Sequence, residues 1–292
     1  MDERKSITEL LALYSLEDTI KDIYVEGERD KQFISWFVGA EGGGRIGVYA
    51  IGDIDVSNKV LDKYNLPHGS NRSRVIAVAN ELSDGLPDCN NILFIADRDY
   101  EDYLPCMAES RFFAFTDYNS IESYIITEDA MRKIISIVYG LHSGHTPRFY
   151  YDLKEILRKI FSIRLANESL KWNMSWIEFN KYIKVRPILV FNEEKFIEAY
   201  LRKNSKWSKR AEFNTCLELC RKQLHDDCRL SIRGHDFSAL LLHYLNKKCI
   251  RKKLDKVDLF EGFLLSSLER NDLLNEGMLK LVHEFSTGEL HL

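Results

Sequence analysis

The chain has few cysteines and no long apolar run. Only six of its 292 residues are cysteine, and their number and irregular spacing exclude a disulfide framework, so we expect reduced thiols. No stretch approaches the roughly 18 unbroken apolar residues of a membrane-spanning helix. The opening sequence, MDERK, lacks the apolar segment of a secretory signal peptide. We therefore expect a cytoplasmic protein.

A phosphate-binding loop is also missing. No Gly-x-x-x-x-Gly-Lys-Ser/Thr pattern occurs anywhere, and the run Gly42–Gly44 is followed by no such lysine. Internal repeats and low-complexity segments are absent as well. We therefore do not expect this chain to hydrolyse ATP itself.

The charges that are present divide the chain unevenly. An apolar fraction of 45% and a charged fraction of 29% suit a globular protein with a full core. Residues 1–150 carry 15 Lys/Arg against 25 Asp/Glu, whereas residues 151–260 carry 24 against 14. The later region can attract a polyanion, although a basic helical face can also be merely solvated.

Short apolar runs alternate with helical patterns in the first half of the chain. We predict strands at 21–25, 45–51, 91–96 and 111–116, and helices at 6–20, 29–38, 72–82 and 120–139. This alternation predicts an α/β fold with a mostly parallel sheet flanked by helices.

The strand signal fades after about residue 150. We predict helices at 152–161, 193–203, 211–225, 237–248 and 259–268. The predicted domains are therefore residues 1–148, with the sheet and a leading helix, and residues 149–292, a mainly helical and basic region for nucleic-acid, dimer or partner contacts.

Carboxylates follow two of the predicted strands. Glu26 comes directly after the first, and Asp97 and Asp99 follow the third. The carboxyl ends of parallel strands share one edge of a sheet, where ligands bind. Three carboxylates meeting there repel one another unless a divalent cation neutralises them, and Mg²⁺ (or Mn²⁺) suits their hard oxygen ligands. Helix-cap and turn carboxylates are the alternative.

These motifs resemble a known family. Val25-Glu26-Gly27 after the first strand and Asp97-Arg98-Asp99 after the third are similar to the Toprim domain of topoisomerases, primases and overcoming-lysogenisation-defect nucleases. The stretch 115–124, FTDYNSIESY, resembles a more restricted Toprim family, the effectors of PARIS anti-phage systems, encoded beside ABC-type or AAA ATPases in prokaryotic defence loci.

The resemblance implies a Mg²⁺-dependent endonuclease toxin that its ATPase partner holds inactive until a phage protein triggers release. It also implies an active homodimer and host RNA as substrate, tRNA foremost, with DNA as an alternative. From the residues themselves, a topoisomerase or primase is disfavoured because the chain shows no separate tyrosine cleavage domain and no room for primase modules. A Toprim-like binding or regulatory subunit without catalysis remains the competing class.

Other acidic residues have two interpretations. Glu122 and Asp30 lie near helix starts, where they either join the metal site or interact with the helix dipole. Asn119 is expected as an N-cap. Asp53 and Asp55 form a second Asp-x-Asp, for which a loop role is favoured.

The basic region offers candidate nucleic-acid contacts. They form one run, which consists of Lys203, Lys206, Trp207, Lys209 and Arg210. We expect the cationic side chains to bind an RNA backbone and Trp207 to stack on a base. In the alternative, Trp207 anchors a helix to the core.

Two further motifs lie beyond this run. Asp236 is favoured as the N-cap of the next helix, and in the alternative His235 is a general base or a phosphate contact that reaches toward the metal site. The spacing of Cys216, Cys220 and Cys228 with a nearby histidine favours buried thiols over zinc.

Overall fold

A four-stranded parallel sheet forms the centre of the first of two units in the chain. The computed structural model describes residues 4–39, 46–104, 110–137, 140, 146–185, 188–248 and 256–289, so the predicted loop at 42–44 lies outside the described part. The sheet consists of β2 (Lys21–Val25), β3 (Ile46–Ala50), β5 (Ile92–Ala96) and β6 (Phe113–Phe115). Its strand order is β3-β2-β5-β6, and every neighbouring pair is parallel. The predicted α/β class, with a parallel sheet flanked by helices, is confirmed.

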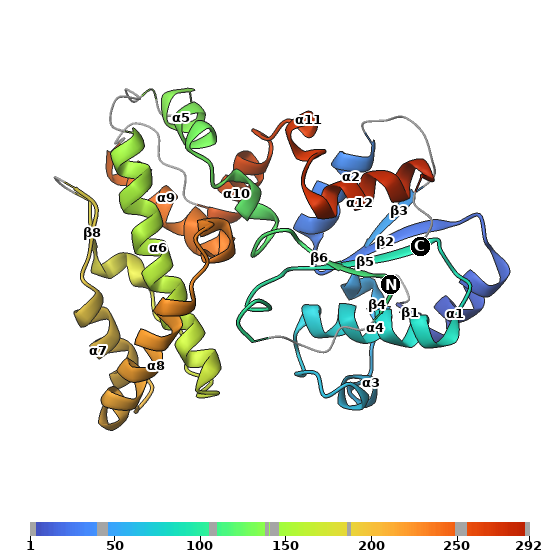
Figure 1. The fold of residues 1–292 in the computed structure, drawn as a ribbon, viewed down its shortest axis with the longest axis horizontal. Helices are drawn as coiled ribbons and strands as arrows, with labels where there is room; N and C mark the ends of the chain where they lie inside the picture. Colours follow the sequence, from blue (N-terminus) through green and yellow to red (C-terminus); the bar gives the residue numbers. More distant parts are fainter. Residues whose placement is uncertain are drawn as a thin grey trace. The chain divides into compact units, whose positions relative to one another are not determined.

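Helices cover both faces of this sheet (Figure 1). The helices α2 (Glu28–Gly39) and α12 (Gly277–Thr287) lie on one face, and α1 (Ile7–Leu16) and α4 (Asn71–Gly85) lie on the other. All five residues of β5 are buried, which is the burial expected of a central strand covered on both sides. Helix α2 buries Phe33, Ile34 and Phe37, the apolar face that its spacing predicts.

Smaller elements complete the first unit. A two-stranded parallel sheet pairs β1 (Lys5–Ser6) with β4 (Ile54–Asp55). Helix α1 begins at a capping box, in which Ser6 and Glu9 satisfy each other's backbone N–H groups. Three further pieces were not predicted from sequence, namely the 3₁₀ turn η1 (Ile51–Asp53), α3 (Asn58–Lys63) and α11 (Arg270–Leu273).

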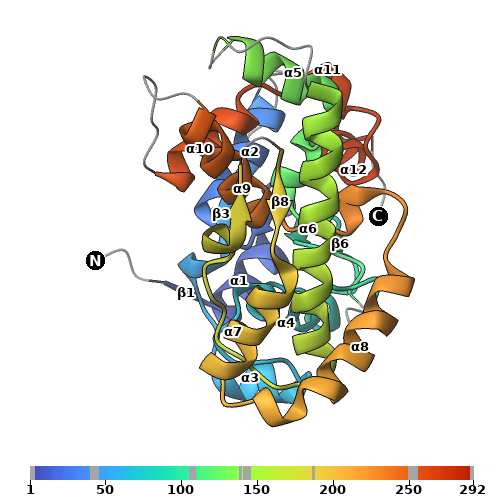
Figure 2. The ribbon, with the colours of Figure 1, turned by 90° about the vertical axis from the view of Figure 1, so that its left-hand side faces the viewer.

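The second unit is mainly helical. Figure 2 shows its long helix α6 (Thr146–Ser169) beside α8 (Arg210–Gln223). Its other helices are α5 (Glu128–Ile137), α7 (Glu193–Lys203), α9 (Gly234–Lys248) and α10 (Val257–Leu265). One hydrophobic cluster joins them, with Phe161, Phe196 and Phe237 each at most 1% exposed. No helix in the described part of the chain is both long and apolar enough to cross a membrane.

Short elements connect these helices. They are the 3₁₀ turns η2 (Ile121–Ile125), η4 (Phe179–Tyr182), η5 (Trp207–Lys209) and η6 (Cys228–Leu230), and the antiparallel pair β7 (Ile183–Lys184) and β8 (Val190–Phe191). The pair β7–β8 was not predicted, because two-residue strands are too short to produce an alternating pattern.

The helix predicted at 120–139 is interrupted. Its first part is η2, in which all five residues are buried, and α5 begins only at Glu128. The hydroxyl of Thr127 accepts a hydrogen bond from the Ala130 N–H at 3.2 Å, as a residue that caps a new helix does. A segment buried on every side lacks the one-sided pattern on which the prediction of a single helix rested.

The two units divide the chain differently from the predicted boundary after residue 148. The first unit comprises Met1–Arg98, Pro105–Asp117 and Glu269–Leu292, and the second comprises Asp99–Leu104 and Tyr118–Leu268. The division follows packing rather than chain order. Residues 125–166 contribute to the same hydrophobic cluster as α7 to α10, while α12 packs against α2.

Candidate functional site

Glu26 and Asp97 meet at the carboxyl edge of the sheet. They follow β2 and β5, which are parallel neighbours in the strand order. The backbone N–H of Asp97 donates a hydrogen bond to Oε1 of Glu26 at 2.8 Å. The predicted approach of these two strand ends is therefore confirmed, and it follows from their shared direction.

The start of α4 fixes the backbone on either side of this contact. Asn71 donates its side-chain amide to the carbonyl of Glu26 at 3.0 Å. Arg72 donates Nε–H to the carbonyl of Asp97, also at 3.0 Å, and its guanidinium lies 5.1 Å from the ring centre of Phe115. Both acidic residues are partly buried. Hydrogen bonds from α4 thus hold the backbone of both carboxylate-bearing residues at the sheet edge.

Asp30 has a structural role beside this edge. Its Oδ2 accepts a hydrogen bond from the N–H of Gly27 at 2.9 Å, which satisfies a backbone donor at the start of α2. Of the two interpretations made from sequence, the structure supports a favourable acid in the first helical turn. Participation of Asp30 in a metal site stays a prediction.

Asp99 belongs to the second unit. Strand β5 ends at Ala96, and Asp99 has a φ of +47°, in the left-handed region. From their spacing, Asp97 and Asp99 would share one face if the strand continued through both. That expectation is wrong, because the chain is no longer extended at Asp99. The backbone N–H of Asp99 donates to the carbonyl of Asn119 at 3.0 Å. Convergence of Asp99 with Glu26 stays a prediction.

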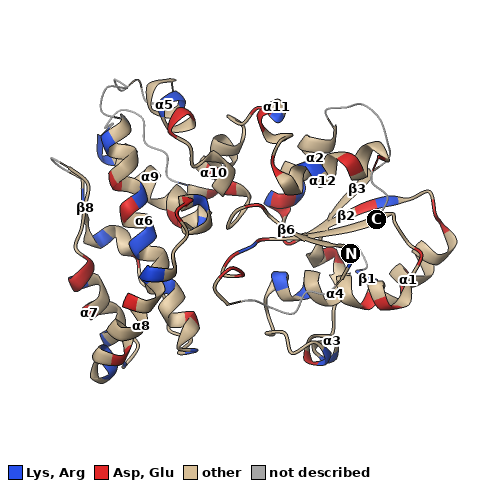
Figure 3. Cartoon of the chain, viewed as in Figure 1, with Lys and Arg blue, Asp and Glu red and all other residues tan. Residues whose placement is uncertain are grey.

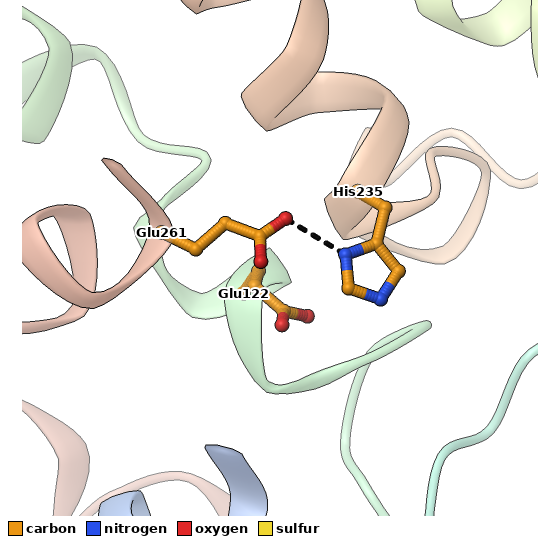
Figure 4. A group of neighbouring side chains, drawn as sticks. All are labelled: Glu122, His235 and Glu261. Atoms are coloured by element: carbon orange, nitrogen blue, oxygen red, sulfur yellow. Dashed lines mark hydrogen bonds and ion pairs between the residues drawn. The ribbon is translucent and has the colours of Figure 1, made fainter. Parts of the chain in front are cut away.

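A second group of ionisable residues lies within the second unit. Glu122 in η2, His235 in α9 and Glu261 in α10 bring potential ligand atoms within 4.8 Å of one another (Figure 4). Nδ1 of His235 and Oε1 of Glu261 lie 2.7 Å apart. This hydrogen bond raises the pKa of His235 to about 9, with help from the charges of Glu122 and Glu261 and against the opposing effects of desolvation and of Arg233.

The two glutamates of this group are buried, and the histidine is exposed. Glu122 is 4% exposed and Glu261 is 2% exposed. Oε2 of Glu122 accepts a hydrogen bond from the Ser120 hydroxyl at 2.6 Å. A Cβ atom at Gly234 would lie 2.6 Å from Cβ of Glu122, so only glycine lets the start of α9 approach this closely.

Sequence analysis singled out Glu122 and His235 but missed Glu261. Its one visible signal is a lone acid within the apolar stretch VDLFEGFLL of α10, where it takes a buried position. The pairing with His235 spans 26 residues, and no local pattern predicts it.

Two predicted helix caps are wrong. Helix α9 begins at Gly234, so Asp236 lies in its first turn and instead forms a two-bonded ion pair with Arg164 at 2.7 and 2.8 Å. Asn119 precedes the turn η2, whose N-cap is Ser120. The side-chain amide of Asn119 donates to the carbonyl of Leu230 at 3.2 Å. Both residues serve contacts between segments distant in sequence.

The basic run at 203–210 contacts other parts of its own unit. Lys203 donates to the carbonyl of Trp176 at 3.0 Å, and the ammonium groups of Lys206 and Lys209 lie 5.3 and 5.5 Å from the ring centre of Trp172. The three lysines keep their positive charges in these interactions. Figure 3 shows Asp and Glu as well as Lys and Arg on α7 and α8, the helices on either side of this run.

Trp207 is packed against the hydrophobic cluster of the second unit. The guanidinium groups of Arg202 and Arg210 lie 4.3 and 5.0 Å from its ring centre. Arg210 also pairs with Glu194 at 3.3 Å. Of the two roles considered for Trp207, these contacts support the anchor to the core.

A basic cavity of about 580 Å³ opens elsewhere in the second unit. Its lining includes Lys181, Lys184, Lys247 and His243, with Glu178 as the acidic member. Glu178 pairs with Lys181 at 2.9 Å. The cavity joins β7 to α9, and its cationic lining suits a phosphate-bearing ligand.

The remaining motifs behave as structural elements. Cys216, Cys220 and Cys228 are free thiols in the structure, and none belongs to a potential metal-binding group among the described residues. Burial raises the pKa of the Cys220 thiol to about 11. Oδ2 of Asp53 lies 3.9 Å from Nζ of Lys31, and Asp55 is exposed at the end of β4.

No protein-family model matches the chain, and no curated protein matches it.

Proposed function

We propose that the chain is a metal-dependent endonuclease. The observation that carries this proposal is the hydrogen bond from the Asp97 N–H to Glu26 Oε1, which ties two acidic residues together at the carboxyl ends of neighbouring parallel strands. This is the edge of a parallel sheet at which ligands bind. The order of the motifs along the chain, Val25-Glu26-Gly27 and then Asp97-Arg98-Asp99, resembles the Toprim nucleases.

The donor chemistry of this edge fits Mg²⁺ or Mn²⁺. Glu26 and Asp97 offer carboxylate oxygens, the ligands that hard divalent cations prefer. Such an ion supplies charge stabilisation to a phosphodiester undergoing hydrolysis. In the proposal, Glu26 and Asp97 hold the ion, and Asp99 is the third ligand that the resemblance implies. Asn71 and Arg72 position the backbone that carries the first two residues.

The substrate in this proposal is nucleic acid, with host tRNA foremost and DNA as the alternative. Residues 151–260 carry ten more basic than acidic side chains, as a polyanion-binding surface requires. Within that region, the lysines of the cavity and of the run at 203–210 are the candidate backbone contacts. The resemblance of residues 115–124 extends the proposal to a toxin effector of an anti-phage system. In such a system, the chain acts as a homodimer after its release from an ABC-type or AAA ATPase.

The test is the substitution Glu26→Gln, which keeps a carbonyl oxygen to accept the Asp97 N–H but removes the negative charge. We expect RNA cleavage by the purified full chain to fall at least about 100-fold, the loss typical for a residue that stabilises charge in the reaction. Toxicity in cells should disappear in parallel. The matched control is Asp55→Asn, which removes a carboxylate from an exposed strand end of the same unit.

Unchanged circular dichroism and melting temperature will show that Glu26→Gln leaves the fold intact. Cleavage by this variant at the wild-type rate would overturn the assignment. Sequencing of host RNA ends after induction of the wild type names the substrate, and DNA nicking in the same assay would select the alternative.

A second candidate is a Toprim-like regulatory subunit without catalysis. It is favoured by one observation, namely that Glu26 and Asp30 both accept hydrogen bonds from backbone N–H groups, as structural carboxylates do. A Mg²⁺ titration of the isolated chain separates the two. Absence of metal affinity, together with toxicity that chelators do not change, selects the regulatory role.

A further inference from the structure

Two glutamates and a histidine converge from three separate elements of the second unit. Glu122 lies in η2, His235 at the start of α9 and Glu261 in α10, and their side chains point toward one another (Figure 4). We propose that these three residues bind a divalent transition-metal ion, of the class of Zn²⁺ or Mn²⁺. All three residues belong to the second unit, and the proposal does not depend on the proposed Mg²⁺ site at Glu26.

The spacing of the ligand atoms suits one ion. One potential ligand atom from each residue lies within 4.8 Å of the others, and Nδ1 of His235 is 2.7 Å from Oε1 of Glu261. Metal–nitrogen and metal–oxygen bonds of about 2.1 Å at tetrahedral angles place ligand atoms roughly 3.4 Å apart. Small rotations of the side chains are therefore enough to bring all three onto one ion, without movement of the backbone.

The burial of the two carboxylates supports a cation at this place. Glu122 and Glu261 are 4% and 2% exposed, and buried charges require a partner of opposite sign. The imidazole of His235 brings one positive charge to the two carboxylates when it is protonated, and Arg233 is a further positive charge that acts on His235. A dication neutralises both, and it replaces the close hydrogen bond with bonds to all three side chains.

Three oxygen atoms on or beside the elements that carry Glu122 and His235 are also buried without a partner. Within the described residues, Oδ1 of Asn119, Oγ of Ser123 and Oγ of Ser238 are buried and lack a hydrogen-bond partner. Asn119 and Ser123 flank Glu122 in sequence, and Ser238 lies one turn along α9 from His235. Unsatisfied buried polar atoms are usually explained by ordered water or an ion, which agrees with a metal site formed by these elements.

The ligand set selects the kind of metal. Mg²⁺ takes oxygen ligands in nearly ideal octahedral geometry, whereas an imidazole nitrogen beside carboxylates suits transition ions. The side chain of His235 is 65% exposed, so one side of the ion faces solvent. Three protein ligands with an open position are typical of a metal that binds water or substrate, rather than of a closed structural site.

The test is metal binding by the full chain, measured without any activity. Titration with Zn²⁺ in a calorimeter gives stoichiometry and affinity, and Co²⁺ gives a visible absorption spectrum that reports the ligands. We expect a site whose spectrum lacks a thiolate-to-cobalt band and which is retained in Glu26→Gln. Glu261→Gln and His235→Asn should each weaken binding at least roughly tenfold, because loss even of a supporting residue costs 10–100-fold in affinity.

Two controls distinguish this site from other sources of binding. Glu26→Gln should keep the Co²⁺ spectrum, so a failure of the nuclease proposal leaves this result unaffected. His68→Asn removes an exposed histidine that pairs with a single carboxylate, Asp62, at 2.7 Å, and should change nothing. Circular dichroism and melting curves establish that each variant is folded. The proposal is overturned if the wild type binds no ion, or if folded Glu261→Gln binds within twofold of the wild type.

Discussion

The two units place ionisable residues by different means. In the first unit, Glu26 and Asp97 occupy the ends of adjacent parallel strands, and backbone groups hold them there. In the second unit, pairs such as Arg164–Asp236 and His235–Glu261 are made by side chains from different helices. A sheet thus assembles charged residues through its backbone register, whereas a helical unit must do so through side-chain packing.

Because of this difference, we expect the loss of one residue of an ion pair to lower the free energy of unfolding more in the second unit than in the first. Arg164 and Asp236 pair at 2.7 Å with side chains only 16% and 8% exposed, and the Arg164 guanidinium lies 3.7 Å from the ring centre of Trp176. Removing one member of a buried pair leaves an uncompensated charge. We therefore expect Arg164→Met to lower the free energy of unfolding by about 3–5 kcal/mol, measured by urea denaturation.

An exposed pair supplies the control for this measurement. Arg132 and Glu128 lie one helical turn apart in α5, with side chains 51% and 41% exposed. Arg132→Met should cost less than about 1 kcal/mol, since exposed ion pairs contribute little. A similar small loss in both variants would contradict the comparison of the units.

The same difference explains what the sequence could predict. The strands at 21–25 and 91–96 and the carboxylates that follow them were predictable, because apolar runs and their ends are local patterns. Helix α7 was predicted with its bounds of Glu193–Lys203. These features depend on residues close together in the chain.

Features made by residues distant in sequence were missed or misassigned. Asp236 was taken for a cap because its partner, Arg164, lies 72 residues away. Glu261 gave no signal beyond its apolar surroundings, and the left-handed φ of Asp99 has no local marker. Likewise, the chain pattern does not reveal that 269–292 belong with the sheet, because that assignment comes from packing.

The first unit also contains one buried carboxylate that the sheet does not place at an edge. Asp22 in β2 is 4% exposed and accepts a hydrogen bond from the Tyr14 hydroxyl at 2.5 Å. Burial raises the pKa of Asp22 above its usual value near 3.8, although the Tyr14 bond, Lys5 and the backbone at Gly47 oppose this shift. Tyr24 and Tyr49 are further titratable neighbours of Asp22, and Asp53 acts on both tyrosines.

The sign of the pH dependence follows from this shift. Between the unfolded pKa and the higher folded pKa, the native state binds more protons than the unfolded state, so stability falls as pH rises. Asp22→Asn cannot ionise and keeps an oxygen for the Tyr14 bond. We expect the free energy of unfolding of Asp22→Asn to lack that decline and to exceed that of the wild type at pH 7. Urea denaturation at pH values from 3 to 8 measures both. Parallel pH profiles of variant and wild type would contradict the assignment, and Asp55→Asn is the exposed control.

The smallest expected effect concerns Trp207 and sharpens the contrast between a folded anchor and a nucleic-acid contact. The Arg202 and Arg210 guanidiniums lie over its ring, and exposed cation–π contacts contribute about 0.5–1 kcal/mol each. Trp207→Leu should therefore lower stability by roughly 1–2 kcal/mol and change RNA affinity less than about twofold. Base stacking contributes about 1–3 kcal/mol per base, so a tenfold loss of RNA affinity in a fully folded variant would instead make Trp207 a stacking platform. Fluorescence anisotropy with labelled RNA, beside a melting curve, separates the two outcomes.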